Sequence, residues 1–575
     1  MKKRSDDALG RRLMVVLIFF FIAFGALVSR LFFLQIVHHN DYRTLASKQH
    51  RIEEDIISLR GKIFAQDKTG GRVPLALPNL EKSLVAVPKS ISEKDAVIEF
   101  MAEEFKLDEK IIQEKIGKEN DPYEVLVKKV DPIQAAKLDG KLPSGLFFEE
   151  AQGRVYPHAA RAAHVLGFVN KNEEDYSGRY GIERQYQNEL AGGKEFFDGI
   201  QGSASFWMAL GRRIINPPKN GSDIVLTVDY NIQAKAEEIL LKAKEKWGAA
   251  SGTVLVTDPT TGRILANASL PAFDPNQYGK ERDLSVFLNP GIESMYEFGS
   301  VIKPLTMAAG IEEKLVSPTS TYYDTGEVKF GSYTIRNFDT KAYYTQTMTQ
   351  VLENSLNTGM VHVAKLLGKE RQLQYLQKFG LGEKTKVDLP GEVSGNIGNL
   401  VSLQAREIDF ATASFGQGIA VTPIQLAAAV GALANEGILK RPYIVEKIID
   451  GAGNETLKES EDVRRVVSAE TAETLTKMLV SVVRNGFENY AGVKGYFVAG
   501  KTGTAQISKK DGKGYSDKVI HTFVGYAPAF RPKFLALIQL NDPKGNRFAA
   551  NTLTPAFHDL AQYILNYYEV VPDEK

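Results

Sequence analysis

One serine in the sequence is followed by a lysine at the third position, in Ser300-Val301-Ile302-Lys303. On a helix, side chains three residues apart lie on the same face, so the hydroxyl and the amine can meet. Gly299 and Pro304 are typical of a helix's first turn, where the helix field favours a developing negative charge. Lys303 can accept the serine proton only if desolvation or a second cation lowers its pKa from about 10.4 to about 7. The pair predicts Ser300 as a nucleophile and Lys303 as its base, although alone it also fits a solvated serine and lysine.

Two further polar segments follow Ser300 in order. Ser355-Leu356-Asn357 lies in a loop-forming stretch between helical segments, and Lys501-Thr502-Gly503-Thr504 opens a β-rich region near the end. Either triplet by itself is weak evidence for a site, because the same patterns recur in polar turns at Ser394-Gly395-Asn396 and Lys68-Thr69-Gly70. The three segments together, in this order, resemble the pattern of penicillin-recognising serine transferases.

Composition excludes several other chemistries. The chain of 575 residues has no cysteine, which excludes thiol nucleophiles, zinc–thiolate sites, iron–sulfur clusters and disulfides. Its eight histidines show no His-Glu-x-x-His or similar pairing, so we expect no metal site, and serine chemistry requires no cofactor. The 71 basic and 70 acidic residues leave a net charge of +1, which gives no global field for binding nucleic acid.

The elements that would position these residues form two groups. A Pro/Gly/Asn-rich loop at 216–222 separates a mixed region, which includes a charged helical stretch at 99–118, from a longer C-terminal region. In the latter, turn chemistry predicts one hairpin over 252–269 and another over 518–540, with about 250 mostly helical residues between them. This grouping favours an α+β fold, in which helices flank an antiparallel sheet, over a βαβ fold.

The N-terminus carries an apolar segment. Leu13 to Val28 contains no charge, and the apolar character continues from Leu31 to Val37. Five basic and two acidic residues precede it, so the positive-inside rule predicts a cytoplasmic tail at 1–12 and a transmembrane anchor at 13–37. The rest of the chain would be extracytoplasmic. A cleaved signal peptide is the alternative, but no Ala-x-Ala-like cleavage site is found.

With these motifs in view, the sequence resembles the class B penicillin-binding proteins, monofunctional D,D-transpeptidases of bacterial peptidoglycan synthesis. The resemblance covers most of the chain. It includes Tyr296 to Pro304, with Phe298 where proline is usual, and Ala499 to Gln506 without departure. In the N-terminal region, segments 60–64, 154–157 and 181–183 resemble the family's pedestal, although the acidic residue expected soon after Ile63 is displaced to Asp67.

The resemblance implies a mixed α/β pedestal, or dimerisation-type, domain at 38–220 and a penicillin-binding transpeptidase domain at 221–575. It places the protein in the bacterial inner membrane as a single-pass protein with an extracytoplasmic catalytic domain. The implied partners are peptidoglycan stem peptides, β-lactams as inhibitors, a polytopic glycosyltransferase, and proteins of the division or elongation complex. A septal (cell-division) role and a lateral-wall (cell-shape) role both stay open.

The resemblance also assigns roles to the site. Ser300 would attack the carbonyl between the terminal D-alanines of a stem peptide, and an amine from a neighbouring peptide would then resolve the acyl-enzyme. Lys303 would be the base and Ser355 the proton relay, while Asn357 would bind the substrate amide. The donor carboxylate would be held by Lys501, Thr502 and Thr504. Backbone N–H groups of Ser300 and Thr504 would form the oxyanion hole, and Gly503 would keep the peptide's approach free of a side chain.

Two other functions share parts of this pattern. A β-lactamase or β-lactam sensor uses the same serine and lysine, but it has no evident need for the roughly 180 residues that precede the catalytic region. A catalytically dispensable scaffold of the wall-synthesis complex is the second alternative. It is disfavoured because every predicted catalytic residue is present.

Overall fold

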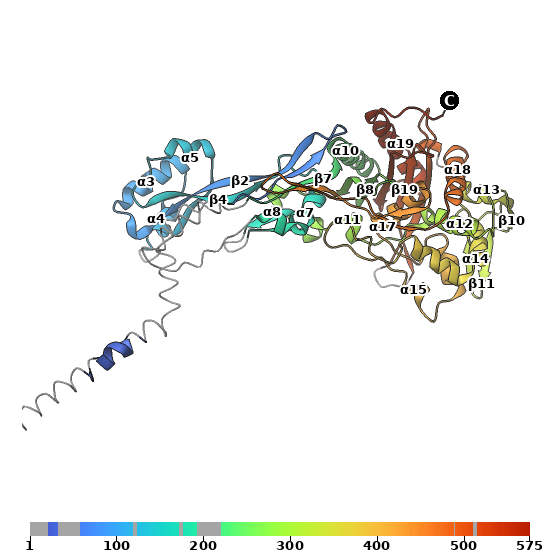
Figure 1. The fold of residues 1–575 in the computed structure, drawn as a ribbon, viewed down its shortest axis with the longest axis horizontal. Helices are drawn as coiled ribbons and strands as arrows, with labels where there is room; N and C mark the ends of the chain where they lie inside the picture. The colour runs from blue at the N-terminus through green and yellow to red at the C-terminus, as the bar shows by residue number, and fades with distance from the viewer. Residues whose placement is uncertain are drawn as a thin grey trace, which may run out of the picture. The chain divides into compact units, whose positions relative to one another are not determined.

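The computed structural model describes residues 21–22, 24–30, 32, 58–118, 123–171, 176–192, 220–487, 489–509 and 514–574 (Figure 1). The chain divides into two compact units, Met1–Ile57 and Ser58–Lys575. The predicted tail at 1–12 and most of the predicted anchor at 13–37 lie outside the described residues, apart from short helical stretches between 21 and 32. Within the described ranges, no helix has both the length and the apolar character needed to cross a membrane.

The second unit begins with a small α/β layer. The long strand β2 (Arg72–Ala86) pairs antiparallel with β3 (Glu124–Val130) and β4 (Leu146–Val155). Helices α3 (Lys94–Phe105), α4 (Glu109–Ile116) and α5 (Pro132–Leu138) lie beside these strands and bury a separate apolar core (Figure 1). The predicted helical stretch at 99–118 is therefore two helices, because Lys106 adopts a left-handed backbone conformation with φ of 54°.

A second group of short elements follows. It consists of α6 (Ala163–Leu166), β5 (Phe168–Lys171), β6 (Tyr176–Arg179), α7 (Gly181–Gln185) and α8 (Gln187–Ala191). Glu183 of α7 is fully buried and accepts from the Nε atoms of Arg60 and Arg154, each at 2.7 Å. Burial would raise the pKa of the Glu183 carboxyl, but the two guanidiniums outweigh it and hold the pKa below its ordinary value.

One sheet joins distant parts of the sequence. Its order is β16-β15-β7-β1-β2-β3, with β4 also on β2. It includes β1 (Ile63–Gln66), which pairs in parallel with β7 (Asp223–Asp229), and then β15 (Val445–Ile449) and β16 (Glu455–Leu457). Strands from before residue 220 and from after residue 440 therefore share a single sheet.

The predicted antiparallel sheet is present, with the order β18-β19-β20-β8-β9. Its strands are β8 (Ser251–Thr257), β9 (Ile264–Leu270), β18 (Ala499–Ser508), β19 (Tyr515–Ala527) and β20 (Phe534–Asn541). Both predicted hairpins, over 252–269 and 518–540, are confirmed, and so is the α+β class.

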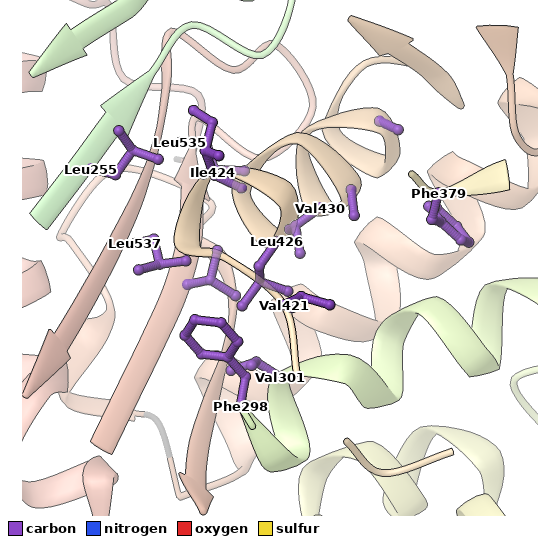
Figure 2. Close-up of a cluster of buried hydrophobic side chains, with 14 of the residues drawn as sticks. Leu255, Phe298, Val301, Phe379, Val421, Ile424, Leu426, Val430, Leu535 and Leu537 are labelled. Atoms are coloured by element: carbon purple, nitrogen blue, oxygen red, sulfur yellow. The ribbon is translucent and has the colours of Figure 1, made fainter. Parts of the chain in front are cut away.

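Helices cover this sheet on both faces. Helices α10 (Tyr230–Lys246) and α19 (Ala549–Tyr567) share one core with it. On the other face, α12 (Lys303–Glu312), α17 (Pro423–Ala434) and α18 (Ala469–Asn485) bury a second core. Figure 2 shows Ile424 of α17 on the side of the sheet residues Leu255, Leu535 and Leu537.

The region between the two hairpins is more varied than its helical pattern predicts. Its helices include η3 (Pro275–Lys280), η4 (Leu284–Phe287), α11 (Pro290–Glu293), η5 (Gly299–Ile302), α13 (Met348–Glu353), α14 (Asn357–Lys378), α15 (Gly398–Val401) and α16 (Glu407–Ala413). Three two-stranded sheets lie among them: β10 (Thr321–Asp324) with β13 (Tyr344–Thr347), β11 (Glu327–Phe330) with β12 (Tyr333–Arg336), and β14 (Ile438–Lys440) with β17 (Asp462–Arg465).

Candidate active site

Ser300 lies in a sharp turn at the start of a helix. It belongs to the 3-10 turn η5, which leads directly into α12. Gly299 has φ of 60°, a conformation that side chains rarely adopt, and its N–H donates to the Gly416 carbonyl at 3.1 Å. Position 416 also has no room for a side chain, because a Cβ atom there would lie 2.2 Å from the Gly299 oxygen. Two glycines therefore allow the serine turn to pack against a neighbouring loop.

Lys303 is completely buried and reaches the second polar segment. Its Nζ atom donates to the Ser355 carbonyl at 2.5 Å and lies 3.2 Å from the Ser355 Oγ atom. Ser355 itself has φ of 52°, which is unusual for a residue other than glycine. A buried lysine in contact with a serine hydroxyl is an arrangement that can move a proton between them.

Asn357 is the first residue of α14. Its Nδ2 atom donates to the Arg336 carbonyl at 2.9 Å, and its side chain is half-buried. Leu356, the middle residue of the triplet, is fully buried and packs into the core. The structure thus places Asn357 two residues after Ser355 and in contact with the last residue of β12.

The third segment forms the strand β18, which ends the order of the five-stranded sheet. Lys501 is buried, Thr502 is half-buried and Thr504 is exposed. The Thr504 hydroxyl accepts from the Ala549 N–H at 3.2 Å, at the beginning of α19. In the described part of the chain no strand pairs with the outer side of β18, so this edge can accept an extended peptide.

Gly503 brings the first and third segments together. A Cβ atom at this position would lie 2.3 Å from the Phe298 carbonyl oxygen and 3.2 Å from the Val301 Cγ1 atom. The structure therefore supplies a reason for this glycine that differs from the expected one. Its missing side chain lets β18 lie directly against the serine turn, which fixes Lys501 and Thr504 relative to Ser300.

Three exposed phenylalanines connect the segment after β12 with the start of α19. The ring of Phe338, two residues beyond Arg336, lies 5.6 Å from that of Phe548 and 5.8 Å from that of Phe487, both edge-on. Phe548 directly precedes Ala549, the residue that donates to Thr504. Sequence reasoning missed this cluster, because nothing in the spacing of three distant phenylalanines predicts that they meet.

Glu297 is a second contributor that sequence reasoning missed. Its Oε2 atom accepts from the Gly418 N–H at 3.1 Å and from the Tyr515 hydroxyl at 2.9 Å. Burial, together with the nearby Glu297 charge, raises the pKa of the Tyr515 phenol. Glu297 therefore ties the serine segment to the β18–β19 hairpin. Its place three residues before Ser300 was the only available signal.

The two decoy triplets lie elsewhere. Lys68 sits in a turn before β2, where its Nζ atom contacts Glu569 at 2.5 Å and lies over the Tyr567 ring. The Ser394 carbonyl accepts from Gln425 at 2.7 Å. Among the described residues no group of three or more acidic or histidine side chains could hold a metal ion.

The assembled geometry defines a class of protein. A serine at a helix start, a buried lysine touching a second serine, and a Lys-Thr-Gly edge strand together can carry out acyl transfer through a serine ester. The family model of the penicillin binding protein transpeptidase domain matches residues 252–562, and that of the penicillin-binding protein dimerisation domain matches residues 55–226. The chain belongs to the penicillin-binding protein transpeptidase family, with the two modules of a class B member.

Individual relatives agree with this assignment. The chain is 32% identical to stage V sporulation protein D of Bacillus subtilis, with 96% of this chain and 85% of the relative covered. It is 29% identical to the peptidoglycan D,D-transpeptidase FtsI homolog of Mesostigma viride, covering 98% and 96%. Among solved structures it is similar to penicillin binding protein 3 of Mycobacterium tuberculosis complexed with aztreonam, with 28% identity, a TM-score of 0.69, and 90% and 97% coverage.

Proposed function

We propose that this protein is a serine-type peptidoglycan D,D-transpeptidase. It cross-links stem peptides through an acyl-enzyme on Ser300, releases D-alanine, and is acylated at the same residue by β-lactams. The observation that carries the proposal is the buried Lys303 Nζ atom, one helical turn from Ser300 and 3.2 Å from the Ser355 hydroxyl. The name of the D,D-transpeptidase relative and the aztreonam complex of the structural neighbour support it.

In the acylation step, Lys303 accepts the Ser300 proton as the serine oxygen attacks the carbonyl carbon of the penultimate D-alanine. The C–N bond to the terminal D-alanine then breaks. Ser355, in contact with Lys303, relays the proton that Lys303 took from Ser300 to the departing amine, which leaves Lys303 neutral again. In the second step the amine of a neighbouring stem peptide attacks the ester carbonyl and forms the new amide. The C–O bond to Ser300 breaks, and the serine oxygen takes up the proton that the amine loses.

The third segment binds the donor. The peptide lies along the outer edge of β18 as an added strand, and Asn357 donates to its amide. The donor's terminal carboxylate is held by Lys501 with the hydroxyls of Thr502 and Thr504. The N–H groups of Ser300 and Thr504 stabilise the oxyanion, and the contact at Gly503 keeps these two segments at a fixed separation.

The cellular setting is part of the same proposal. The apolar segment at 13–37 anchors the chain in the bacterial inner membrane, with the tail at 1–12 in the cytoplasm and the catalytic domain at 221–575 outside. The pedestal at 38–220, together with the anchor, contacts a polytopic glycosyltransferase and other proteins of the wall-synthesis complex. The family models, which match residues 55–226 and 252–562 in this order, support the division into two domains.

The test is a transpeptidation assay on the full chain with a pentapeptide ending in D-Ala-D-Ala and an amine acceptor. We expect D-alanine release in equal amounts with the cross-linked product, and loss of both in Ser300→Ala. Ser394→Ala, which removes the serine of the decoy triplet, is the matched control and is expected to keep the wild-type rate. Rapid steady hydrolysis of nitrocefin by the wild type would contradict the proposal and indicate a β-lactamase.

A further inference from the structure

The helix that carries Asn357 begins without a cap of its own. The residue at the N-cap of α14 is Leu356, whose side chain makes no capping hydrogen bond. Helix N-termini expose N–H groups that need acceptors, and a leucine cannot supply one. The first turn of α14 is therefore held from outside the helix, although it must place both Ser355 and Asn357.

The acceptors come from the last residue of β12 and the residue that follows it. The Asn337 Oδ1 atom accepts from the Thr358 N–H at 3.3 Å and lies 3.0 Å from the Thr358 hydroxyl. Its neighbour Arg336 accepts from Asn357 through its carbonyl, as described above. Two consecutive residues, Arg336 and Asn337, thus bind two consecutive residues of the helix start.

Asp324, the last residue of β10, lies behind this contact and is completely buried. Its Oδ1 atom accepts from the Thr358 hydroxyl at 2.6 Å and from the Gly326 N–H at 3.1 Å. Its Oδ2 atom accepts from Asn337 Nδ2 at 2.9 Å and from the Tyr343 N–H at 2.8 Å. The carboxylate therefore orients Asn337 and Thr358 at the same time, and all four of its partners are donors.

The strained residue Ser355 lies three positions before Thr358. A positive φ in a residue other than glycine is strained, and it persists where the surroundings enforce it. The Ser355 carbonyl and hydroxyl both face Lys303 in this conformation. If the first turn of α14 were to move, the backbone of Ser355 would be free to relax away from the lysine.

We propose that Asp324 is a positioning residue for acylation. Through Thr358 and Asn337 it holds the start of α14 where Ser355 contacts Lys303 and Asn357 faces the substrate. Asp324 touches neither the reacting atoms nor the donor peptide. The inference rests on the proposed function, because its readout is the acylation of Ser300.

The experiment compares two substitutions that each remove one carboxylate bound to a helix start. In Asp324→Asn, the amide nitrogen must face a backbone N–H, that of Gly326 or that of Tyr343, whichever way it is turned. The control is Glu312→Gln. The Glu312 carboxylate accepts from the Ser468 N–H at 3.0 Å and from the hydroxyls of Ser468 and Thr471, at the start of α18. Helix α18 carries none of the predicted site residues.

The second-order rate constant of acylation by a fluorescent penicillin is measured for each folded protein, together with its melting temperature. We expect Asp324→Asn to be acylated roughly 100-fold more slowly than the wild type, the scale of a misplacement of about 1 Å in an active site. In Glu312→Gln we expect the melting temperature to fall by about as much as in Asp324→Asn, but the acylation rate to equal that of the wild type. An Asp324→Asn protein that acylates as fast as Glu312→Gln would overturn the proposal.

A second pair decides the matter if Asp324→Asn does not fold. Thr358→Ser keeps the hydroxyl that binds Asp324, whereas Thr358→Val removes it. The proposal predicts slow acylation in Thr358→Val and restoration in Thr358→Ser, and equal rates in the two variants would overturn it. A wild-type protein that no penicillin acylates would reject the proposed function itself, a result distinct from a failure confined to the variants.

Discussion

The two sides of the candidate site are held in different ways. On the side of Ser300 and β18, main chain packs directly on main chain, and glycines at 299, 416 and 503 make the close approach possible. On the side of Ser355 and Asn357, side chains make the contacts. The side-chain oxygens of Asp324 and Asn337 accept hydrogen bonds from a helix start that has no cap of its own.

The difference indicates how each side responds to change. Close-packed backbone has no room for added atoms, because no side chain can rotate aside at the point of contact. A network of buried hydrogen bonds has no tolerance for a lost acceptor, since each donor left unpaired costs about 1–3 kcal/mol. Substitutions that add side-chain volume should therefore be most harmful on the glycine side, and substitutions that remove a hydrogen-bond acceptor should be most harmful on the Asp324 side.

Gly503→Ala should have the largest effect on the backbone-packed side. The new Cβ atom would lie 2.3 Å from the Phe298 oxygen, so β18 or the serine turn must move. We expect a loss of about 1–3 kcal/mol in unfolding free energy. Acylation by penicillin should also slow by roughly 100-fold. Stopped-flow acylation and denaturant titration measure the two effects.

The matched control for that substitution is Gly279→Ala. A Cβ atom at Gly279 would meet nothing within 4 Å, so neither the stability nor the acylation rate should change. If Gly503→Ala were acylated as fast as Gly279→Ala, the close contact between β18 and the serine turn would have no role in positioning Ser300.

A smaller effect, in stability alone, should come from His521. This residue pairs with Thr504 across β18 and β19, and burial lowers its pKa to about 4. The unfolded chain binds a proton near pH 6.5 while the folded chain does not, so this stability is complete above pH 6.5 and falls as the pH drops toward 4. In His521→Gln, the loss of unfolding free energy between pH 7 and 4 should shrink by at most about 3 kcal/mol.

His362 provides the comparison on the other side. It stacks on Tyr322 at a centroid distance of 5.5 Å, and partial burial followed by the Lys365 charge lowers its pKa. The sign is the same as for His521, but His362 is only half-buried, so His362→Gln should change the pH dependence less. Urea titrations at several pH values measure both variants. A larger change in His362→Gln would contradict the assignment of the pH-sensitive residue to the β18 side.

The sequence was most informative where a chemical requirement is local. Ser300 and Lys303 are one helical turn apart, and the two sheet hairpins follow from turn chemistry close to each strand. The order of the three polar segments then indicated the family. Helix boundaries were less predictable, since the single left-handed residue Lys106 divides a stretch whose composition is helical throughout.

What could not be predicted depends on contacts between distant segments. Asp324 and Asn337 lie in short strands and loops that the helical pattern of 271–517 conceals, and their partner Thr358 is identified only by the folded geometry. The contact that requires a glycine at position 503 could not be predicted either, because its neighbour Phe298 lies about 200 positions earlier in the chain. The phenylalanine cluster has no sequence signature at all.

The most direct test of the central claim is intact-mass measurement after exposure to benzylpenicillin, followed by peptide mapping. The account predicts one covalent adduct on the wild-type protein, located on the peptide that contains Ser300, and none on Ser300→Ala. Ser394→Ala should gain the adduct as the wild type does. An adduct that persists in Ser300→Ala, or that maps to another serine, would contradict the assignment of Ser300 as the nucleophile.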